Sequence, residues 1–198
     1  CFFHTYSSKP IPLMLYNSKL AVHPDKLLLL RPEVLFLFFL HINPDHYLET
    51  EKGRILSPER NQKAWRQCFL ALQEALSSKT IKNTYLLIGC QASGKSTWAK
   101  QHLLQYPNDL IFDAILVKKS ERKAILHQIN ATHLPCIAVW FQTPLEMCFV
   151  RNSLRPLDEQ VNVQGLRNVY NALEAPCLDE GFHAILIIKP SITETCKS

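Results

Sequence analysis

Four short runs of mainly apolar residues punctuate the second half of the chain, at residues 85–88, 110–112, 136–141 and 184–188. Each run has the length of a strand, and a nearly unbroken apolar run is typical of a strand buried on both faces of a parallel sheet. Segments with helical spacing separate the runs. The pattern therefore predicts strands that alternate with helices, which indicates an α/β fold with a parallel sheet.

The clearest helix signal precedes the first run. Ser57 can cap a helix N-terminus, and Pro58 suits the first helical position. Large apolar residues then recur at helical spacing: Trp65, Phe69, Leu72 and Leu76. We expect this stripe to pack on the core. Further helices are expected over residues 97–106, from Ser120 onward, and over residues 166–173.

The segment after the third apolar run is also expected to begin a helix. Pro144 suits its first position, and Thr143 and Glu146 have the spacing of a capping box. Met147 and Val150 would then point inward. Two arginines, four residues apart, would lie along one side of this helix: Arg151 and Arg155. Their spacing alone favours a solvated helix face.

The regions outside this alternation are harder to interpret. Residues 1–40 contain two apolar bursts separated by charge, and neither approaches the ~20 apolar residues of a membrane span. No small-residue cleavage site follows, which disfavours a signal peptide. We expect a leader or edge extension there, followed by a helical lead-in over residues 41–82. The first part of this lead-in, up to about residue 55, is expected to be a loop or short helical pieces. A main domain over residues 83–190 and a frayed tail over residues 191–198 follow.

One motif carries chemistry. The pattern G-x-x-x-x-G-K-[ST] is filled by Gly89, Gly94, Lys95 and Ser96, between a predicted strand and a predicted helix. The glycines let backbone N–H groups turn around an anion, and the helix start directs its dipole at the same point. Lys95 would reach the β- and γ-phosphates of ATP, and Ser96 would hold Mg²⁺. The alternative, a glycine-containing turn with an incidental lysine, is disfavoured by the flanking strand and helix.

The other loop positions complete the expected nucleotide site: Cys90, Gln91, Ala92, Ser93 and Thr97. We expect the first three to offer mainly their backbone. A cysteine beside a helix N-terminus can have a lowered pKa, but a structural role is the simpler expectation for Cys90.

An acidic residue, Asp113, ends the second apolar run. Right-handed crossovers would place it at the same edge of the sheet as the phosphate loop. A carboxylate at that edge can orient Mg²⁺ or take part in catalysis. Taken alone, Asp113 could equally be a helix cap or a solvated loop residue, but the upstream phosphate loop favours the functional role.

Composition narrows the class of protein. The chain has 198 residues, of which 47% are hydrophobic, enough for one globular domain or one domain with an extension. A net charge of +5 permits phosphate-bearing partners without indicating nucleic acid by itself. The seven cysteines are scattered without a C-x-x-C pair, so we expect reduced thiols in a cytoplasmic protein, with no disulfide frame, zinc site or membrane contact. The eight histidines show no metal-ligand spacing, and surface or packing roles are expected for each.

Two stretches, residues 89–99 and 149–155, together resemble the kinase domain of polynucleotide kinases, within the P-loop kinases. Residues 139–146 and 178–182 are similar to the same group and to its small bacterial ATP-binding relatives. The resemblance implies a P-loop NTPase three-layer sandwich with a small, mostly parallel sheet. It implies ATP on the phosphate loop and an Arg155 that contacts the transferring phosphoryl group, and it leaves Arg151 undecided between catalysis and a solvated face.

The chain departs from that family at one point. Polynucleotide kinases have, after the first helix, a strand that supplies the general base for the acceptor hydroxyl. Here only about a dozen residues separate the phosphate loop from the strand before Asp113, so this segment is missing or merged. Asp113 then serves as both metal organiser and base, or the acceptor chemistry differs. Similar proteins have an arginine at the position of Arg122, in the following segment, which allows a support or substrate role; an ordinary helix-start charge is the favoured expectation.

Three functions fit these features. The leading one is an ATP- and Mg²⁺-dependent phosphotransferase that acts on a hydroxyl, with a polynucleotide 5′ end or a nucleotide among the acceptors considered. The second is an ATPase or nucleotide-sensing module, which the shortened segment favours. The third is a nucleic-acid-binding protein with a degenerate nucleotide site, which the intact Lys95 and Ser96 disfavour. The oligomeric state is not fixed by these features.

Overall fold

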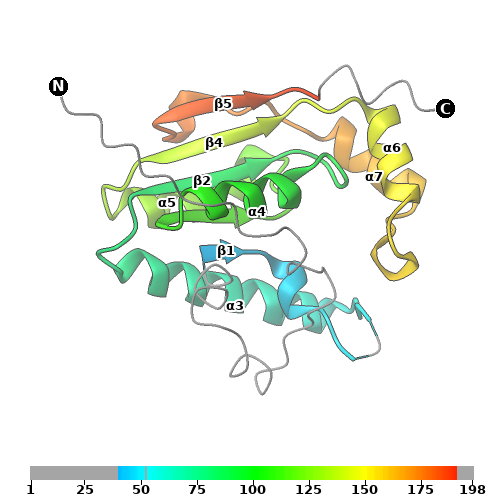
Figure 1. The fold of residues 1–198 in the computed structure, drawn as a ribbon, viewed down its shortest axis with the longest axis horizontal. Helices are drawn as coiled ribbons and strands as arrows, with labels where there is room; N and C mark the ends of the chain where they lie inside the picture. Colours follow the sequence, from blue (N-terminus) through cyan, green and yellow to red (C-terminus); the bar gives the residue numbers. More distant parts are fainter. Residues whose placement is uncertain (1–39, 52, 191–198) are drawn as a thin grey trace.

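The computed structural model describes residues 40–51 and 53–190, and these form one parallel α/β sheet with helices around it (Figure 1). The five strands lie in the order β1-β3-β2-β4-β5, and every neighbouring pair is parallel. Their bounds are His41–Ile42 for β1, Asn83–Ile88 for β2, Asp109–Asp113 for β3, Cys136–Phe141 for β4 and Ala184–Ile188 for β5. The expected fold class and the four expected strands are confirmed. The expectations for residues 1–39 and 191–198 lie outside the described residues.

The first strand is a correction to the sequence analysis, which expected a loop or short helical pieces, and no strand, at the start of the lead-in. His41 and Ile42 pair with Ile111 and Phe112 of β3, so β1 forms an edge of the sheet. A 3-10 turn, η2 (Pro44–Tyr47), follows it directly. The lead-in is therefore part of the sheet and carries residues to the carboxyl ends of the strands.

Five α-helices connect or cover the strands: α3 (Pro58–Ser77), α4 (Lys95–Gln105), α5 (Lys119–Asn130), α6 (Leu145–Ser153) and α7 (Val163–Asn171). The N-terminus of α3 is capped as expected, since the side chain of Ser57 accepts a hydrogen bond from the backbone N–H of Arg60. Among the described residues, no helix is long and apolar enough to cross a membrane.

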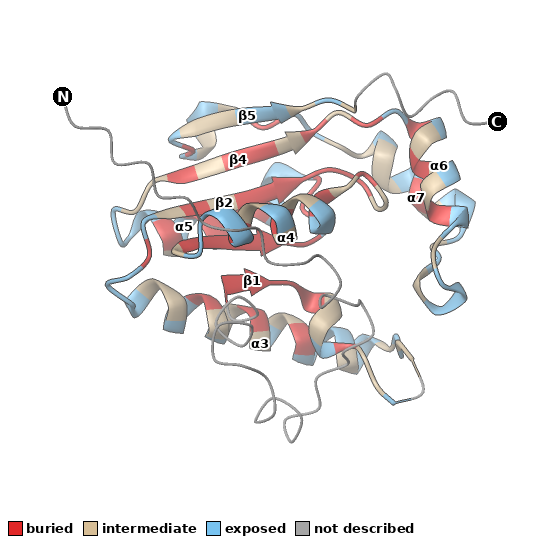
Figure 2. Cartoon of the chain, in the orientation of Figure 1, coloured by how far each residue is buried: buried red, intermediate tan, exposed pale blue. Residues whose placement is uncertain are grey.

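The helices pack on both faces of the sheet, which gives three layers. Trp65 of α3 stacks on Phe112, with ring centroids 6.1 Å apart. Trp98 of α4 packs on Tyr85, which is paired with Ile111 and therefore points to the opposite face from Phe112. Figure 2 shows the buried centre of the molecule along β2, β3 and β4, between these helices.

Helix α6 differs from the expectation in three respects. The hydroxyl of Thr143 donates to the backbone carbonyl of Ser93 at 2.9 Å and no side chain caps the helix, so the predicted capping box is wrong. The predicted inward position of Val150 is also wrong, because Val150 is 61% exposed, whereas Met147 is partly buried. The buried positions are instead the following: Leu145, Cys148 and Asn152. The helix ends at Ser153, so Arg155 lies beyond it.

For Arg122 a helix-start charge was favoured over a supporting role, and the structure corrects this, because the side chain supports the fold. Its side chain is fully buried, and Nε and Nη2 donate to the two carboxylate oxygens of Glu180 at 2.6 and 2.9 Å. Its Nη1 donates to three backbone carbonyls: those of Leu116, Val117 and Glu174. A planar guanidinium suits this geometry, so Arg122 ties α5 to the segment before β5.

Candidate functional site

The phosphate-loop sequence forms a tight turn between β2 and α4. Gly94, the N-cap of α4, has φ +103°, a conformation that L side chains rarely adopt. A Cβ at Gly89 would lie 2.9 Å from the Oγ of Ser93 and 3.0 Å from the Cβ of Phe141. Both glycines are therefore required by backbone geometry or by space, as the motif predicted.

Lys95 is the first residue of α4, and its ammonium group folds back over the loop. Its Nζ donates to the backbone carbonyls of Gly89 at 2.8 Å and of Cys90 at 2.7 Å. Burial lowers the pKa of Lys95, and the negative charge of Asp113 opposes this shift. A buried ammonium group held on two carbonyls at the loop is suited to bind the oxygens of a polyphosphate.

Ser96 and Asp113 meet at the carboxyl edge of the sheet, as the crossover argument predicted. The hydroxyl of Ser96 donates to Oδ2 of Asp113 at 2.6 Å. The same oxygen accepts from Asn43 Nδ2 and lies within hydrogen-bond distance of His41 Nε2, each at 3.1 Å. Burial alone would raise the pKa of Asp113, but the neighbouring His41, Lys95 and Ser96 outweigh it and lower the pKa to about 2. Asp113 is therefore a stable carboxylate.

Two of these partners were missed by the sequence analysis. His41 was expected to have a surface or packing role, and this is corrected by its buried contact with Asp113. Asn43 joins two carboxylate-bearing segments, because its Nδ2 donates to Asp113 while its Oδ1 accepts from the backbone N–H of Asp45 at 2.9 Å. The signal available in the sequence was the polar series His-Ile-Asn-Pro-Asp, a pattern compatible with the end of a short strand.

Asp45 is the second carboxylate at this edge, and it also was missed. Its side chain is 44% exposed, and its Oδ2 lies 3.0 Å from Nη1 of Arg54, which also pairs with Glu49. Burial raises the pKa of Asp45, Arg54 opposes the shift, and the charge of Asp113 adds to it. The two carboxylates therefore differ in character, since Asp113 is held ionised and Asp45 binds a proton more readily.

Arg151 and Arg155 both reach the same cleft, although they come from a helix and from the loop after it. Nη1 of Arg151 donates to the carbonyl of Ser93 in the phosphate loop at 3.3 Å. Arg155 donates from Nη1 to the carbonyl of Glu159 at 3.0 Å and pairs with its carboxylate at 3.4 Å. The structure thus places the two predicted arginines in the same cleft as Lys95, with Arg151 in contact with the phosphate loop.

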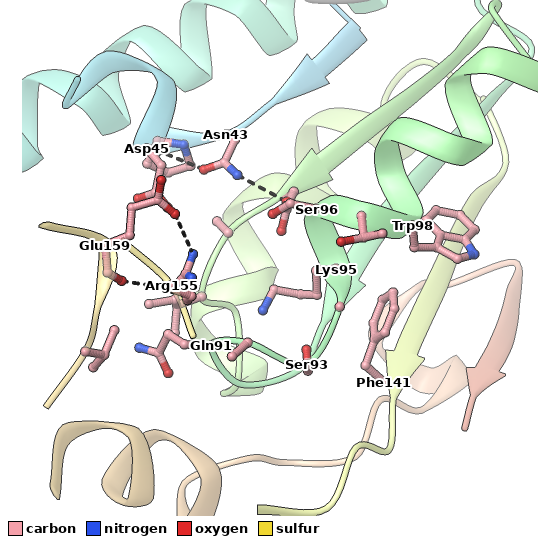
Figure 3. A pocket seen from close by; sticks show the side chains of 18 of the residues that line it. Asn43, Asp45, Gln91, Ser93, Lys95, Ser96, Trp98, Phe141, Arg155 and Glu159 are labelled. Atoms are coloured by element: carbon pink, nitrogen blue, oxygen red, sulfur yellow. Dashed lines mark hydrogen bonds and ion pairs between the residues drawn. The ribbon is translucent and has the colours of Figure 1, made fainter. Parts of the chain in front are cut away.

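These groups line a cleft of about 1330 Å³. In Figure 3, Asp45 and Arg155 lie on one side of Lys95, while Trp98 and Phe141 lie on the other. This volume exceeds the roughly 300–1,000 Å³ that is typical of a cleft for one small ligand. All predicted site residues line it except Gly89 and Cys90, which lie behind the loop surface.

The donor set fits a hard divalent cation bound together with phosphate. The oxygens of Ser96 and Asp113 are adjacent, and Mg²⁺ prefers such oxygens, with one or two carboxylates plus substrate phosphates. Within the described part of the chain, no group of three or more His, Cys, Asp or Glu side chains could hold a metal ion. Binding of Mg²⁺ here therefore requires the additional oxygens of a phosphate ligand or water.

Comparisons with known proteins add no family to this description. No protein-family model matches the chain, and no curated protein matches it significantly. The parallel sheet is of the kind found in Rossmann-like and P-loop-like folds. The resemblance to polynucleotide kinases stays a prediction that depends on the motifs described above.

Proposed function

We propose that the protein is an ATP- and Mg²⁺-dependent phosphotransferase that moves the γ-phosphoryl group of ATP to a hydroxyl acceptor. The observation that carries this proposal is the contact of Ser96 with Asp113 beside the buried Lys95, at the carboxyl edge of the sheet. A cation-binding pair next to a phosphate-binding loop is the arrangement that phosphoryl transfer requires.

Different groups of the phosphate loop would bind different parts of ATP. The backbone N–H groups of the loop and the start of α4 surround the phosphates, and Lys95 neutralises part of their charge. Mg²⁺, held by Ser96 and Asp113, would screen the remaining negative charge when the nucleotide is bound. Trp98 and Phe141, on the other side of Lys95 from Asp45, offer aromatic surface for the nucleoside.

The acceptor side of the cleft contains Asp45, and we assign it the role of general base. Asp113 is a poor base, because its pKa is about 2 and three side chains share one of its oxygens. Asp45 has a raised pKa and a partly exposed carboxylate. Asp45, on η2, would take the place of the base that polynucleotide kinases have between the first helix and the next strand. A general base is most effective when its pKa is raised toward the working pH, which is the direction of the shift at Asp45.

Arg155, on the same side of Lys95 as Asp45, and Arg151 add positive charge to the cleft. In phosphoryl transfer, negative charge spreads over the equatorial oxygens of the moving group, and an arginine can stabilise this charge. The present contacts of Arg155 with Glu159 are partly exposed, so they are exchangeable for contacts with a phosphoryl group.

A transfer assay tests this function. The protein is incubated with γ-labelled ATP, Mg²⁺ and a panel of 5′-hydroxyl oligonucleotides, nucleosides and sugar nucleotides, with Lys95→Ala as the inactive control. We expect label on one acceptor class, loss of that label with Lys95→Ala, and strong reduction with Asp45→Asn. Label that appears only as free phosphate with every acceptor would count against transfer.

A second function, an ATPase or nucleotide-sensing module, is favoured by one specific observation. Helix α4 ends at Gln105 and β3 begins at Asp109, so no acceptor-activating strand lies between them. In this case the turnover of ATP would change the affinity for a partner. Release of a bound partner by ATP, without any phosphorylated acceptor, would support this function over the first.

A further inference from the structure

Two cysteines from distant parts of the chain meet behind the phosphate loop. Cys90 follows Gly89 in the loop, Cys148 lies on α6, and their Sγ atoms are 3.2 Å apart. Both side chains are buried in a small apolar cluster with Leu145 and Leu166. A disulfide has an S–S distance of about 2.05 Å, so these sulfur atoms need to approach by only about 1 Å to form one.

The two thiols are not equivalent. The hydrogen bond between the two thiols and the nearby charge of Lys95 hold the pKa of Cys90 below its usual range, against the effect of burial. The same hydrogen bond and burial raise the pKa of Cys148. Burial raises the pKa of two other cysteines, Cys68 to about 12 and Cys136 to about 11. Cys90 is therefore the more readily deprotonated of the two thiols, and Cys148 is its adjacent partner.

We propose that Cys90 and Cys148 form an oxidation site, at which a peroxide creates a disulfide that weakens the binding of nucleotide to the phosphate loop. In the first step, the Cys90 thiolate attacks a peroxide oxygen, an S–O bond forms, the O–O bond breaks, and hydroxide leaves when the oxidant is hydrogen peroxide. In the second step, the sulfur of Cys148 attacks the sulfenic sulfur of Cys90. The S–S bond forms, the S–O bond breaks, and hydroxide leaves with the Cys148 proton as water.

The effect on nucleotide follows from what Cys90 holds in place, and this step rests on the proposed function. The backbone carbonyl of Cys90 accepts a hydrogen bond from Lys95, and α6 carries Arg151, which donates to Ser93 in the same loop. A bond between Cys90 and Cys148 pulls the loop toward α6. Since loss of a single charge-assisted hydrogen bond to phosphate costs about tenfold or more in affinity, we expect the Kd for ATP to rise at least about tenfold.

The oxidation site is tested on the full chain by peptide mapping. The protein is treated with hydrogen peroxide, free thiols are blocked, and the chain is cut with trypsin and a glutamyl protease without reduction. This digestion separates Cys136 from Cys148, because Glu146 lies between them, and it leaves Cys90 in the peptide of residues 83–95 and Cys148 in that of residues 147–151. We expect these two peptides to be linked by a bond that a dithiol reductant removes.

Variants connect the bond to nucleotide binding. Cys148→Ala should bind ATP in the reduced state and keep that affinity after peroxide, whereas the wild type and the matched control Cys136→Ala should lose affinity and regain it on reduction. Absence of the linked peptide, or an unchanged Kd for ATP in the linked protein, overturns the proposal. The linked peptide is measured without nucleotide, so it tests the oxidation site alone. If the proposed function is wrong, the reduced protein will not bind ATP, and this result is seen separately.

Discussion

Replacing Asp113 by asparagine tests the electrostatics of the site in isolation. Asparagine keeps an oxygen that can accept the hydrogen bonds from Ser96 and Asn43, so the shape of the site is preserved and the charge is removed. The pKa of Asp113 falls from an ordinary value of 3.8 to about 2 in the folded protein. At 1.36 kcal/mol per unit, this shift stabilises the folded state by about 2 kcal/mol at neutral pH.

The sign of the pH dependence follows from the direction of the shift. A carboxyl whose folded pKa is depressed contributes stability above its unfolded pKa, and this stability is lost as the pH falls through the folded pKa. Urea unfolding should therefore show Asp113→Asn about 2 kcal/mol less stable than the wild type at pH 7, with the difference shrinking between about pH 4 and pH 2.

A matched variant separates this effect from a general loss of charge in the cleft. Asp45→Asn removes a carboxylate whose pKa is raised, so it should lose less stability at pH 7 than Asp113→Asn. If the proposed function holds, turnover should fall by about 100-fold or more with Asp113→Asn, because the proposed Mg²⁺ site would lose the carboxylate of its Ser96–Asp113 pair. Equal stability of the wild type and Asp113→Asn at both ends of the pH range would refute the electrostatic reasoning.

Three further predictions concern the frame of the site and the phosphoryl position. Arg122→Met should lower the free energy of unfolding in urea by about 3–5 kcal/mol, because it leaves Glu180 without its buried partner. A loss no larger than that of the surface variant Arg66→Met would contradict this. Gly94→Ala should weaken ATP binding in calorimetry, since an alanine at φ +103° is strained by about 1–3 kcal/mol. Unchanged affinity for ATP would contradict the claim that this position requires glycine. Arg155→Ala should reduce the rate of transfer by up to about 1,000-fold with little change in the Kd for ATP; equal losses in both would assign Arg155 to ground-state binding.

The sequence predicted the parts of the fold that have a clear hydrophobic pattern or a known motif. Apolar runs located β2, β3, β4 and β5, and the phosphate-loop pattern placed Lys95 and Ser96 at the start of α4. The crossover rule then brought Asp113 to Ser96, 2.6 Å away. These features could be predicted because they depend on local pattern and on chain handedness.

The missed elements depend on contacts that no local pattern records. The strand β1 has only two residues, so it shows no alternation, and its polar His41 is buried by pairing with Asp113. On α6, Asn152 is buried because it bonds both backbone groups of Val161, while the apolar Val150 is left exposed. Arg122 is another case, since its burial depends on Glu180, 58 residues later. Specific polar partners outweighed the hydrophobic pattern at all three places.

The most direct test of the nucleotide function is calorimetric titration of ATP with Mg²⁺ into the wild type and Lys95→Ala. Lys95 bridges two carbonyls of the loop and is the buried cation nearest to the expected phosphates. We predict binding to the wild type that depends on Mg²⁺, and an affinity at least about tenfold lower for a folded Lys95→Ala. The same affinity in both proteins, or no binding to the wild type, would contradict the assignment of this loop as a phosphate-binding site.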